Sequence, residues 1–181
     1  MLMNKNDSLL LIIDVQEHLA PAQESPRDVI NGCAALLDIA KKLNIPYIVA
    51  EQNHASFGPT MIDLRIILGD EMQYLEKDTF SCFKNEEIRK TIENSGKRQI
   101  VIAGLETHLC VLQTALDLHR AGYEVFVIAD ACSSRNGMQS ALGIQRLLRN
   151  NVDVATVEMA IFEWLENSRS PEFREVWSKR S

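Results

Sequence analysis

The sequence predicts a single α/β domain built around a six-stranded parallel sheet. Apolar runs alternate with segments of helical periodicity along the chain, which is the pattern of successive βαβ units. The apolar runs are continuous rather than alternating, as in strands that are buried on both faces. With 181 residues, of which 46% are hydrophobic and 24% charged, residues 1–181 have the size and composition of one ordinary globular domain.

Six apolar segments are the predicted strands. The first carries the run Leu9-Leu10-Leu11-Ile12-Ile13 and ends on Asp14, so it delivers an acid to the carboxyl end of a strand. In chain order the segments are Ser8–Asp14, Tyr47–Glu51, Gln73–Glu76, Arg98–Ala103, Glu124–Ala129 and Val152–Val157.

Helices are predicted between these strands. The first begins with Ser25 as N-cap and Pro26 at the first helical position, and it runs to about Leu43. The others are Asn85–Asn94, a helix around Cys110 that ends at Arg120, Gly137–Arg149, and a last helix that begins after Ser170-Pro171. The irregular stretch from Asn53 to about Met61 is long enough to be an active-site loop.

Charge and cysteine content restrict the partners and the compartment. The net charge of −6 and the pI near 5.3 argue against nucleic acid or an anionic membrane as the main partner. No segment approaches the ~20 apolar residues of a membrane span, and the polar start of the chain predicts no signal peptide. The four cysteines form no CxxC pair, so a reducing cytoplasm is expected, with Cys33 and Cys132 as buried packing residues.

The segment from Gly104 to Cys110 carries the clearest chemical signal. It follows the apolar run that ends at Ala103, which places Cys110 in the first turn of a helix beyond a buried strand. Backbone N–H groups and the helix dipole favour a thiolate at such a position, and the thiolate is the nucleophile. The alternative is a small apolar residue that packs the helix on the sheet. Asp14 and Lys77 also lie at strand ends, and carboxyl ends of parallel strands share one crevice.

Three segments around these residues resemble, in their order, the isochorismatase-like cysteine hydrolases. They are Asp14-Val15-Gln16, the stretch from Glu76-Lys77 to Phe83, and the stretch from Gly104 to Val111. The chain is most similar to the subgroup of small isochorismatase-domain proteins. The resemblance implies a Rossmann-like, three-layer sandwich with strand order 3-2-1-4-5-6. It extends over Gln113–Leu118, Ala129–Arg135 and Pro171-Glu172-Phe173.

The resemblance assigns roles to individual residues of a catalytic triad. Cys110 is the expected nucleophile, Asp14 the base that accepts its proton, and Lys77 the positive charge that opposes them. The expected oxyanion hole consists of the backbone N–H groups of Glu106 and Cys110. In relatives a cis peptide bond aims the second N–H group, and the matching bond here joins Leu105 and Glu106.

Substrate contacts are less well marked. Gln16 follows the first strand and Phe80 follows Lys77, so either side chain is a candidate for substrate binding or for simple packing. His108 is expected to be structural, because a residue two positions from Cys110 lies on a different face of a helix.

No metal or other cofactor is expected. Nicotinamidase relatives bind a metal through an aspartate and two histidines, whereas this chain has Glu51-Gln52-Asn53-His54 near the second strand, and its four histidines form no cluster. His54 is therefore expected to be a loop residue. Relatives that cleave isochorismate do not need the cysteine, so Cys110 argues against that reaction.

The predicted function is hydrolysis of a small-molecule carboxamide or related C–N bond through a thioester acyl-enzyme. The alternative is a non-catalytic or redox-responsive interaction protein that keeps the fold and exposes Cys110 to oxidation. Relatives form dimers or larger assemblies, so a homo-oligomer is expected. The late apolar residues divide between the sheet and such an interface; they include Ile161, Phe162, Trp164, Phe173 and Trp177.

Overall fold

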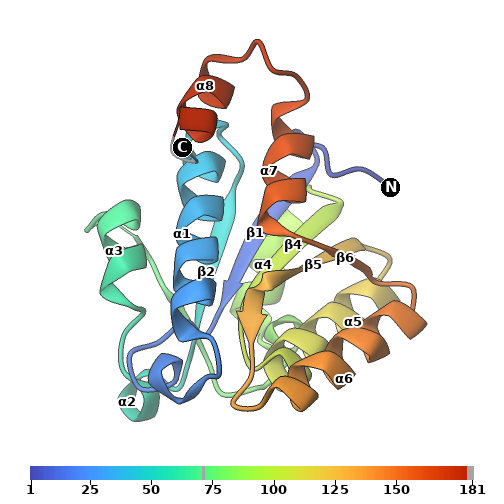
Figure 1. Ribbon diagram of the computed structural model, residues 1–181. Coiled ribbons are helices and arrows are strands. Elements are labelled where there is room, and N and C mark those ends of the chain that lie inside the picture. Colours follow the sequence, from blue (N-terminus) through green and yellow to red (C-terminus); the bar gives the residue numbers. More distant parts are fainter. Residues whose placement is uncertain (71, 179–181) are drawn as a thin grey trace.

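The computed structural model describes residues 1–70 and 72–178, and only the backbone of Trp177. Its strands form one parallel sheet in the order β3-β2-β1-β4-β5-β6 (Figure 1). The predicted fold class and strand order are confirmed. The strands are β1 (Ser8–Ile13), β2 (Tyr47–Gln52), β3 (Leu75–Lys77), β4 (Gln99–Leu105), β5 (Glu124–Ser133) and β6 (Asp153–Ala155).

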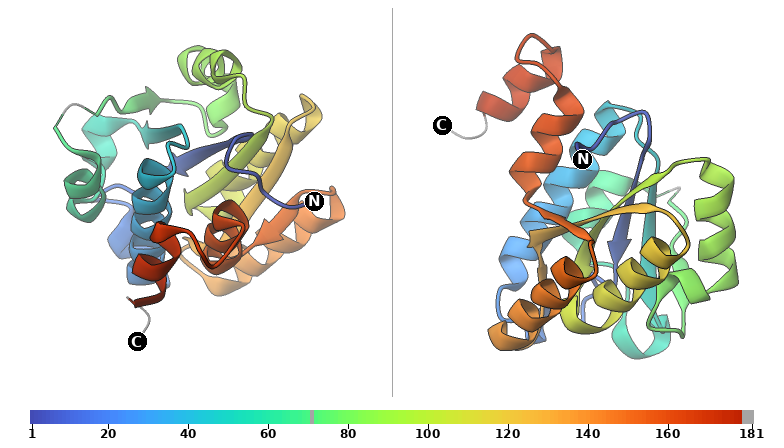
Figure 2. Two further views of the ribbon diagram at one scale, coloured as in Figure 1. Left: turned by 90° about the horizontal axis from the view of Figure 1, so that it is seen from above. Right: turned by 90° about the vertical axis from the view of Figure 1, so that its right-hand side faces the viewer.

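Helices cover both faces of the sheet, and α1 and α4 lie on opposite sides of it (Figure 2). Alternate residues of β1 serve the two cores: Leu10 and Ile12 pack in one, Leu11 and Ile13 in the other. One face carries α1 (Pro26–Lys42), α3 (Ile62–Leu68), α7 (Val157–Leu165) and α8 (Pro171–Ser178), and the other carries α4 (Glu86–Ser95), α5 (Leu112–Arg120) and α6 (Gly137–Arg149). The short elements are η1 (Ala20–Ala22), α2 (His54–Phe57), η2 (Cys82–Lys84) and the π-helical turn η3 (Thr107–Val111).

Several boundaries differ from those predicted. The predicted last strand is shorter, because Thr156 caps α7 and accepts a hydrogen bond from the Met159 N–H. The helices α2, α3 and α7 were not predicted, since such short helices depend on tertiary packing for their stability. Ser25 precedes α1 as expected, but its side chain makes no capping hydrogen bond. None of the described helices is both long and apolar enough to cross a membrane.

The predicted roles of the late apolar residues and of two cysteines have mixed outcomes. Ile161 and Trp164 are buried in the core, and Phe162 packs edge-to-face on Phe173 across 5.8 Å. Cys33 is buried as expected, whereas Cys132 is only half-buried. The Trp177 side chain lies outside the described part of the chain. The described late apolar residues therefore lie in or pack against the core on one face of the sheet, and their part in an interface stays a prediction.

The fold brings three strand ends to one edge of the sheet. Asp14 follows β1, Lys77 ends β3, and β4 leads into η3. β1 and β4 approach closely there: a Cβ on Gly104 would lie 2.1 Å from the Ile13 carbonyl oxygen, and the φ of Gly104 is 139°. Only glycine fits this crossing, so Gly104 sets the position of the chain that leads to Cys110.

Candidate active site

A buried ion pair lies at the centre of this sheet edge. The Lys77 Nζ donates to Asp14 Oδ2 at 2.9 Å and to Gln52 Oε1 at 2.6 Å. The side chains of Lys77 and Asp14 are 0% and 1% exposed. Withdrawing two charges from water costs several kcal/mol for each ion, so such a pair adds little stability. Its presence points to a chemical role.

Cys110 completes the predicted group of three residues. The residue is 5% exposed, and its thiol lies close enough to Asp14 and Lys77 for both charges to act on it. It lies in the π-helical turn η3 rather than in the first turn of an α-helix. Single π-helical turns occur frequently at functional sites. The structure therefore brings Asp14, Lys77 and Cys110 together at the place where the sequence predicts them.

The electrostatics of the thiol differ from the expectation. Burial raises the pKa of Cys110 above its ordinary value, the negative charge of Asp14 raises it further, and Lys77 only partly opposes them. The expectation of a resting thiolate is therefore wrong, because desolvation outweighs the helix terminus. Burial also raises the pKa of Asp14, against the lowering influence of Lys77. A carboxylate that is made more basic is suited to accept the thiol proton.

The turn before Cys110 differs from the expectation as well. The peptide bond between Leu105 and Glu106 is trans, so the expected cis bond is not present. The chain turns instead through Glu106, whose φ is 59°. A left-handed residue reverses the chain direction with a trans bond, so the cis geometry is not needed for the turn.

The Glu106 side chain is buried, and its partners come from other parts of the chain. Its Oε1 accepts a hydrogen bond from Gln23 Nε2 at 3.2 Å and forms an ion pair with Arg135 Nε at 3.0 Å. Arg135 ends one of the segments that carry the family resemblance, which is a usable signal. Gln23 carries no such signal, because it reaches Glu106 from a part of the chain 83 residues away.

The two predicted substrate contacts differ in their surroundings. The Gln16 amide donates to the carbonyl oxygens of Gln52 and Gly58, and its oxygen accepts from the Gln52 N–H. Both amide hydrogens of Gln16 are thus used within the chain, which favours a structural role that joins β1 to β2. Phe80 is 57% exposed, and its role in substrate binding stays a prediction. The His108 ring is hydrogen-bonded to Ser134 Oγ at 2.9 Å, in keeping with a structural role.

The second strand ends in a carboxylate–histidine pair. Glu51 is buried, and its Oε1 accepts from the Thr60 N–H and hydroxyl at 2.7 and 2.6 Å. The His54 Nδ1 lies 2.6 Å from the other oxygen of Glu51. Within the described residues no group of three or more His, Cys, Asp or Glu side chains is arranged to hold a metal ion. The contacts of Glu51 with His54 and Thr60 stabilise the conformation of the chain that follows β2.

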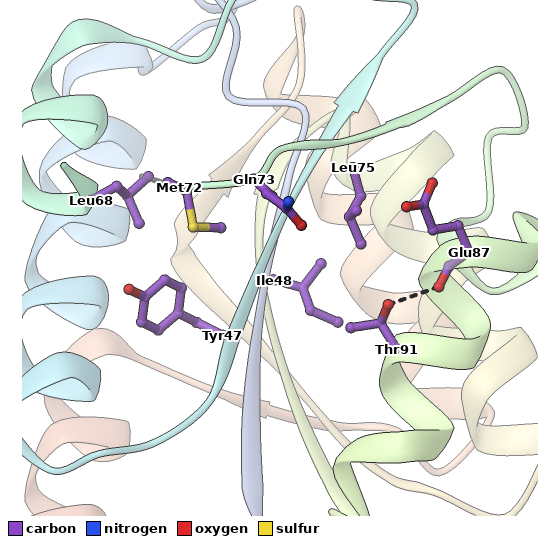
Figure 3. A pocket seen from close by; sticks show the side chains of 8 residues that line it. All are labelled: Tyr47, Ile48, Leu68, Met72, Gln73, Leu75, Glu87 and Thr91. Atoms are coloured by element: carbon purple, nitrogen blue, oxygen red, sulfur yellow. Dashed lines mark hydrogen bonds between the residues drawn. The ribbon is translucent and has the colours of Figure 1, made fainter. Parts of the chain in front are cut away.

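The cavity shown in Figure 3 lies elsewhere in the fold. It has a volume of about 550 Å³ and lies beside Tyr47 and Ile48, at the start of β2. Glu87 and Thr91 of α4 close its other side, joined by the hydrogen bond that the figure draws. None of the residues that line this cavity belongs to the Asp14–Lys77–Cys110 group. The candidate active site is therefore the carboxyl edge of the sheet.

Comparison with known proteins gives consistent results. Residues 8–159 match the model of the isochorismatase domain. The chain is 32% identical over 174 residues to isochorismatase domain-containing protein 2 of Xenopus laevis, covering 96% of this chain and 83% of that protein.

Solved structures agree with this match. A Caenorhabditis elegans structure described as MAR1 ribonuclease has a TM-score of 0.91 at 29% identity, covering 98% of this chain and 91% of the other. The Escherichia coli YcaC gene product, described as an octameric hydrolase of unknown specificity, has a TM-score of 0.88 at 24% identity, covering 99% and 96%. At 24% identity, the likeness to the YcaC gene product shows a shared fold alone. On the domain match and the relatives together, the chain belongs to the isochorismatase family.

Proposed function

We propose that the protein is a cysteine hydrolase that cleaves a carboxamide or related C–N bond of a small molecule through a thioester. The buried Lys77–Asp14 ion pair, whose two charges act on the adjacent Cys110 thiol, carries this proposal. The contacts join a nucleophile to a base and the base to a fixed cation, which is the general arrangement of an activated nucleophile.

The reaction assigns each proton to a side chain. Asp14 accepts the Cys110 proton as the sulfur forms a bond to the substrate carbonyl carbon. The N–H groups of Glu106 and Cys110 stabilise the resulting oxyanion. The C–N bond then breaks, and Asp14 returns the proton to the leaving amine. In the second half Asp14 takes a proton from water, whose oxygen attacks the thioester and releases the acid and the thiol. Lys77 remains a cation throughout and supplies the fixed positive charge beside Asp14. The reaction as proposed uses no metal or other cofactor.

The raised pKa of Cys110 disfavours the alternative of a redox-responsive, non-catalytic protein. A thiol that senses oxidants needs thiolate character and exposure, whereas Cys110 is buried beside an anion. A reducing compartment is the proposed location, because the four cysteines are free. A net charge of −6 argues against RNA as the substrate, even though one similar protein is described as a ribonuclease.

We also propose that the chain forms a homo-oligomer, as the YcaC gene product is described to do. The interface involves other residues than the late apolar ones. Large apolar side chains that are exposed include Ile66 on α3 and Met138 and Leu142 on α6. Sedimentation at micromolar concentration tests this proposal, and a species of only 20.4 kDa would contradict it.

Ammonia release from a panel of small primary amides tests the hydrolase function directly. The wild-type protein is expected to turn over at least one amide and to show an acyl adduct on Cys110 by mass spectrometry. Cys110→Ala is expected to do neither. Turnover that survives in Cys110→Ala would overturn the proposed nucleophile.

A further inference from the structure

Glu106 combines an unfavourable backbone conformation with a tightly held side chain. Its φ of 59° lies in the left-handed region, which is unfavourable for a residue other than glycine. Such a conformation persists only where the surroundings hold it. The buried carboxylate of Glu106 is held at Oε1 by Gln23 Nε2 at 3.2 Å and by Arg135 Nε at 3.0 Å, and the His108 Nδ1 lies 3.5 Å from its Oε2.

The two partners are themselves fixed to the fold. Gln23 is buried, and its Nε2 also lies 3.2 Å from the Leu19 carbonyl oxygen. The next residue, Glu24, donates its N–H to the Ser134 carbonyl oxygen at 3.0 Å. Arg135 directly follows Ser134. The chain after η1 and the chain after β5 are therefore joined to each other, and each sends one side chain to Glu106.

We propose that Gln23, Arg135 and the Glu106 carboxylate form a clamp that holds the Glu106 backbone N–H toward the oxyanion of the substrate. The proposal rests on the proposed hydrolase function. The three side chains are positioning residues, since they act through the Glu106 backbone and not on the reacting atoms. Without the clamp, the backbone of Glu106 relaxes out of the left-handed region. This change of φ turns the Glu106 N–H away from the substrate oxyanion.

Two reactions of the same sulfur separate this role from general damage. With p-nitrophenyl acetate, sulfur bonds to the carbonyl carbon, p-nitrophenolate leaves, and the thiol proton passes to Asp14; an oxyanion forms on the way. With iodoacetamide, sulfur displaces iodide from a saturated carbon, and no oxyanion forms. An oxyanion donor accelerates only the first reaction. The ratio of the acylation rate constant to the alkylation rate constant on Cys110 therefore reports the clamp.

Two substitutions of Glu106 separate the clamp from its charge. Glu106→Ala removes both the charge and the acceptor oxygen, whereas Glu106→Gln removes the charge and keeps an oxygen for Gln23 and Arg135. Arg135→Met removes one arm. Arg120→Met is the matched control, because Arg120 is an exposed arginine at the end of α5 that pairs with Asp117. Thermal unfolding establishes that each variant is folded before the rates are compared.

The ratio is expected to fall about tenfold or more in Glu106→Ala and in Arg135→Met. It is expected to stay within about twofold of the wild type in Glu106→Gln and in Arg120→Met. Equal ratios in Glu106→Ala and Glu106→Gln, or a parallel loss of both reactions, would overturn the clamp while leaving Cys110 as the nucleophile. A wild-type protein in which p-nitrophenyl acetate does not acylate Cys110 would overturn the proposed function and the clamp together.

Discussion

Replacing Lys77 with methionine tests the buried ion pair most directly. Methionine keeps much of the aliphatic volume, so the change removes a charge with little loss of packing. The Asp14 Oδ2 and the Gln52 Oε1 both lose their donor, and Asp14 Oδ1 has no hydrogen-bond partner in the described structure. Asp14 is left as a buried anion without a counter-ion.

The size of the effect follows from two independent estimates. Removing one partner of a buried ion pair costs about 3–5 kcal/mol. Alternatively, Asp14 takes up a proton. Because pH 7 is about 3 units above the ordinary pKa of aspartate, protonating it costs about 4 kcal/mol. Both estimates predict that Lys77→Met lowers the free energy of unfolding by about 4 kcal/mol at pH 7.

The second estimate also predicts the dependence on pH. In the variant the pKa of Asp14 in the folded state lies above that in the unfolded state, because burial is no longer opposed by Lys77. The folded state then binds more protons than the unfolded state, so stability falls as pH rises. The deficit relative to the wild type is expected to shrink to about 1 kcal/mol near pH 4.5.

Urea unfolding at pH 7 and pH 4.5 measures both quantities. Lys84→Met is a suitable control, since Lys84 is 65% exposed and lies 3.8 Å from its partner; it is expected to change stability by less than about 1 kcal/mol. The double variant Asp14→Asn/Lys77→Met removes both charges and is expected to recover most of the stability but no activity. A deficit below about 1 kcal/mol at pH 7, or one that grows on acidification, would refute the reasoning.

Three further predictions concern single residues. Cys110→Ala is expected to abolish turnover and to change the free energy of unfolding by about 1 kcal/mol or less, because alanine suits a helical position and little volume is lost; enzyme assays and urea unfolding check this. Gly104→Ala is expected to cost roughly 2–6 kcal/mol from strain and overlap with Ile13, and an unchanged melting temperature would contradict it. The hydrogen bond and charge of Glu51 raise the pKa of His54, so their pairing is complete below about pH 6.5 and is lost as pH rises through the raised pKa. Melting temperatures between pH 6 and 8.5 are expected to decline more steeply for the wild type than for His54→Gln, and parallel curves would rule out the pairing.

The catalytic candidates were predictable because their signal is local. Asp14 ends an apolar run, and Cys110 lies beyond another, so each occupies a strand end that the sequence alone marks. In a parallel sheet all such ends share one edge, which brings the two residues together without knowledge of any contact. The family resemblance supplied the strand order and the role of Lys77.

The side-chain environment was not predictable in the same way. The sequence suggested a resting thiolate at Cys110, but burial and the adjacent Asp14 charge reverse that expectation. It left Gln16 open between substrate contact and packing, and only the structure shows that the amide of Gln16 joins two strand ends. Desolvation and hydrogen-bond partners depend on atoms contributed by distant segments, so neither can be read from neighbours along the chain.

The sequence by itself therefore determined the α/β class, the strand-end residues and the position of the candidate nucleophile, because hydrophobic periodicity and strand termination are properties of short segments. Only the tertiary structure decided that Glu106 adopts a left-handed conformation with a trans peptide bond and that Gln23 and Arg135 hold its side chain. A backbone conformation of this kind is selected by contacts across the fold rather than by local preference. Those contacts join residues 23, 106 and 135, which meet only once the sheet has formed.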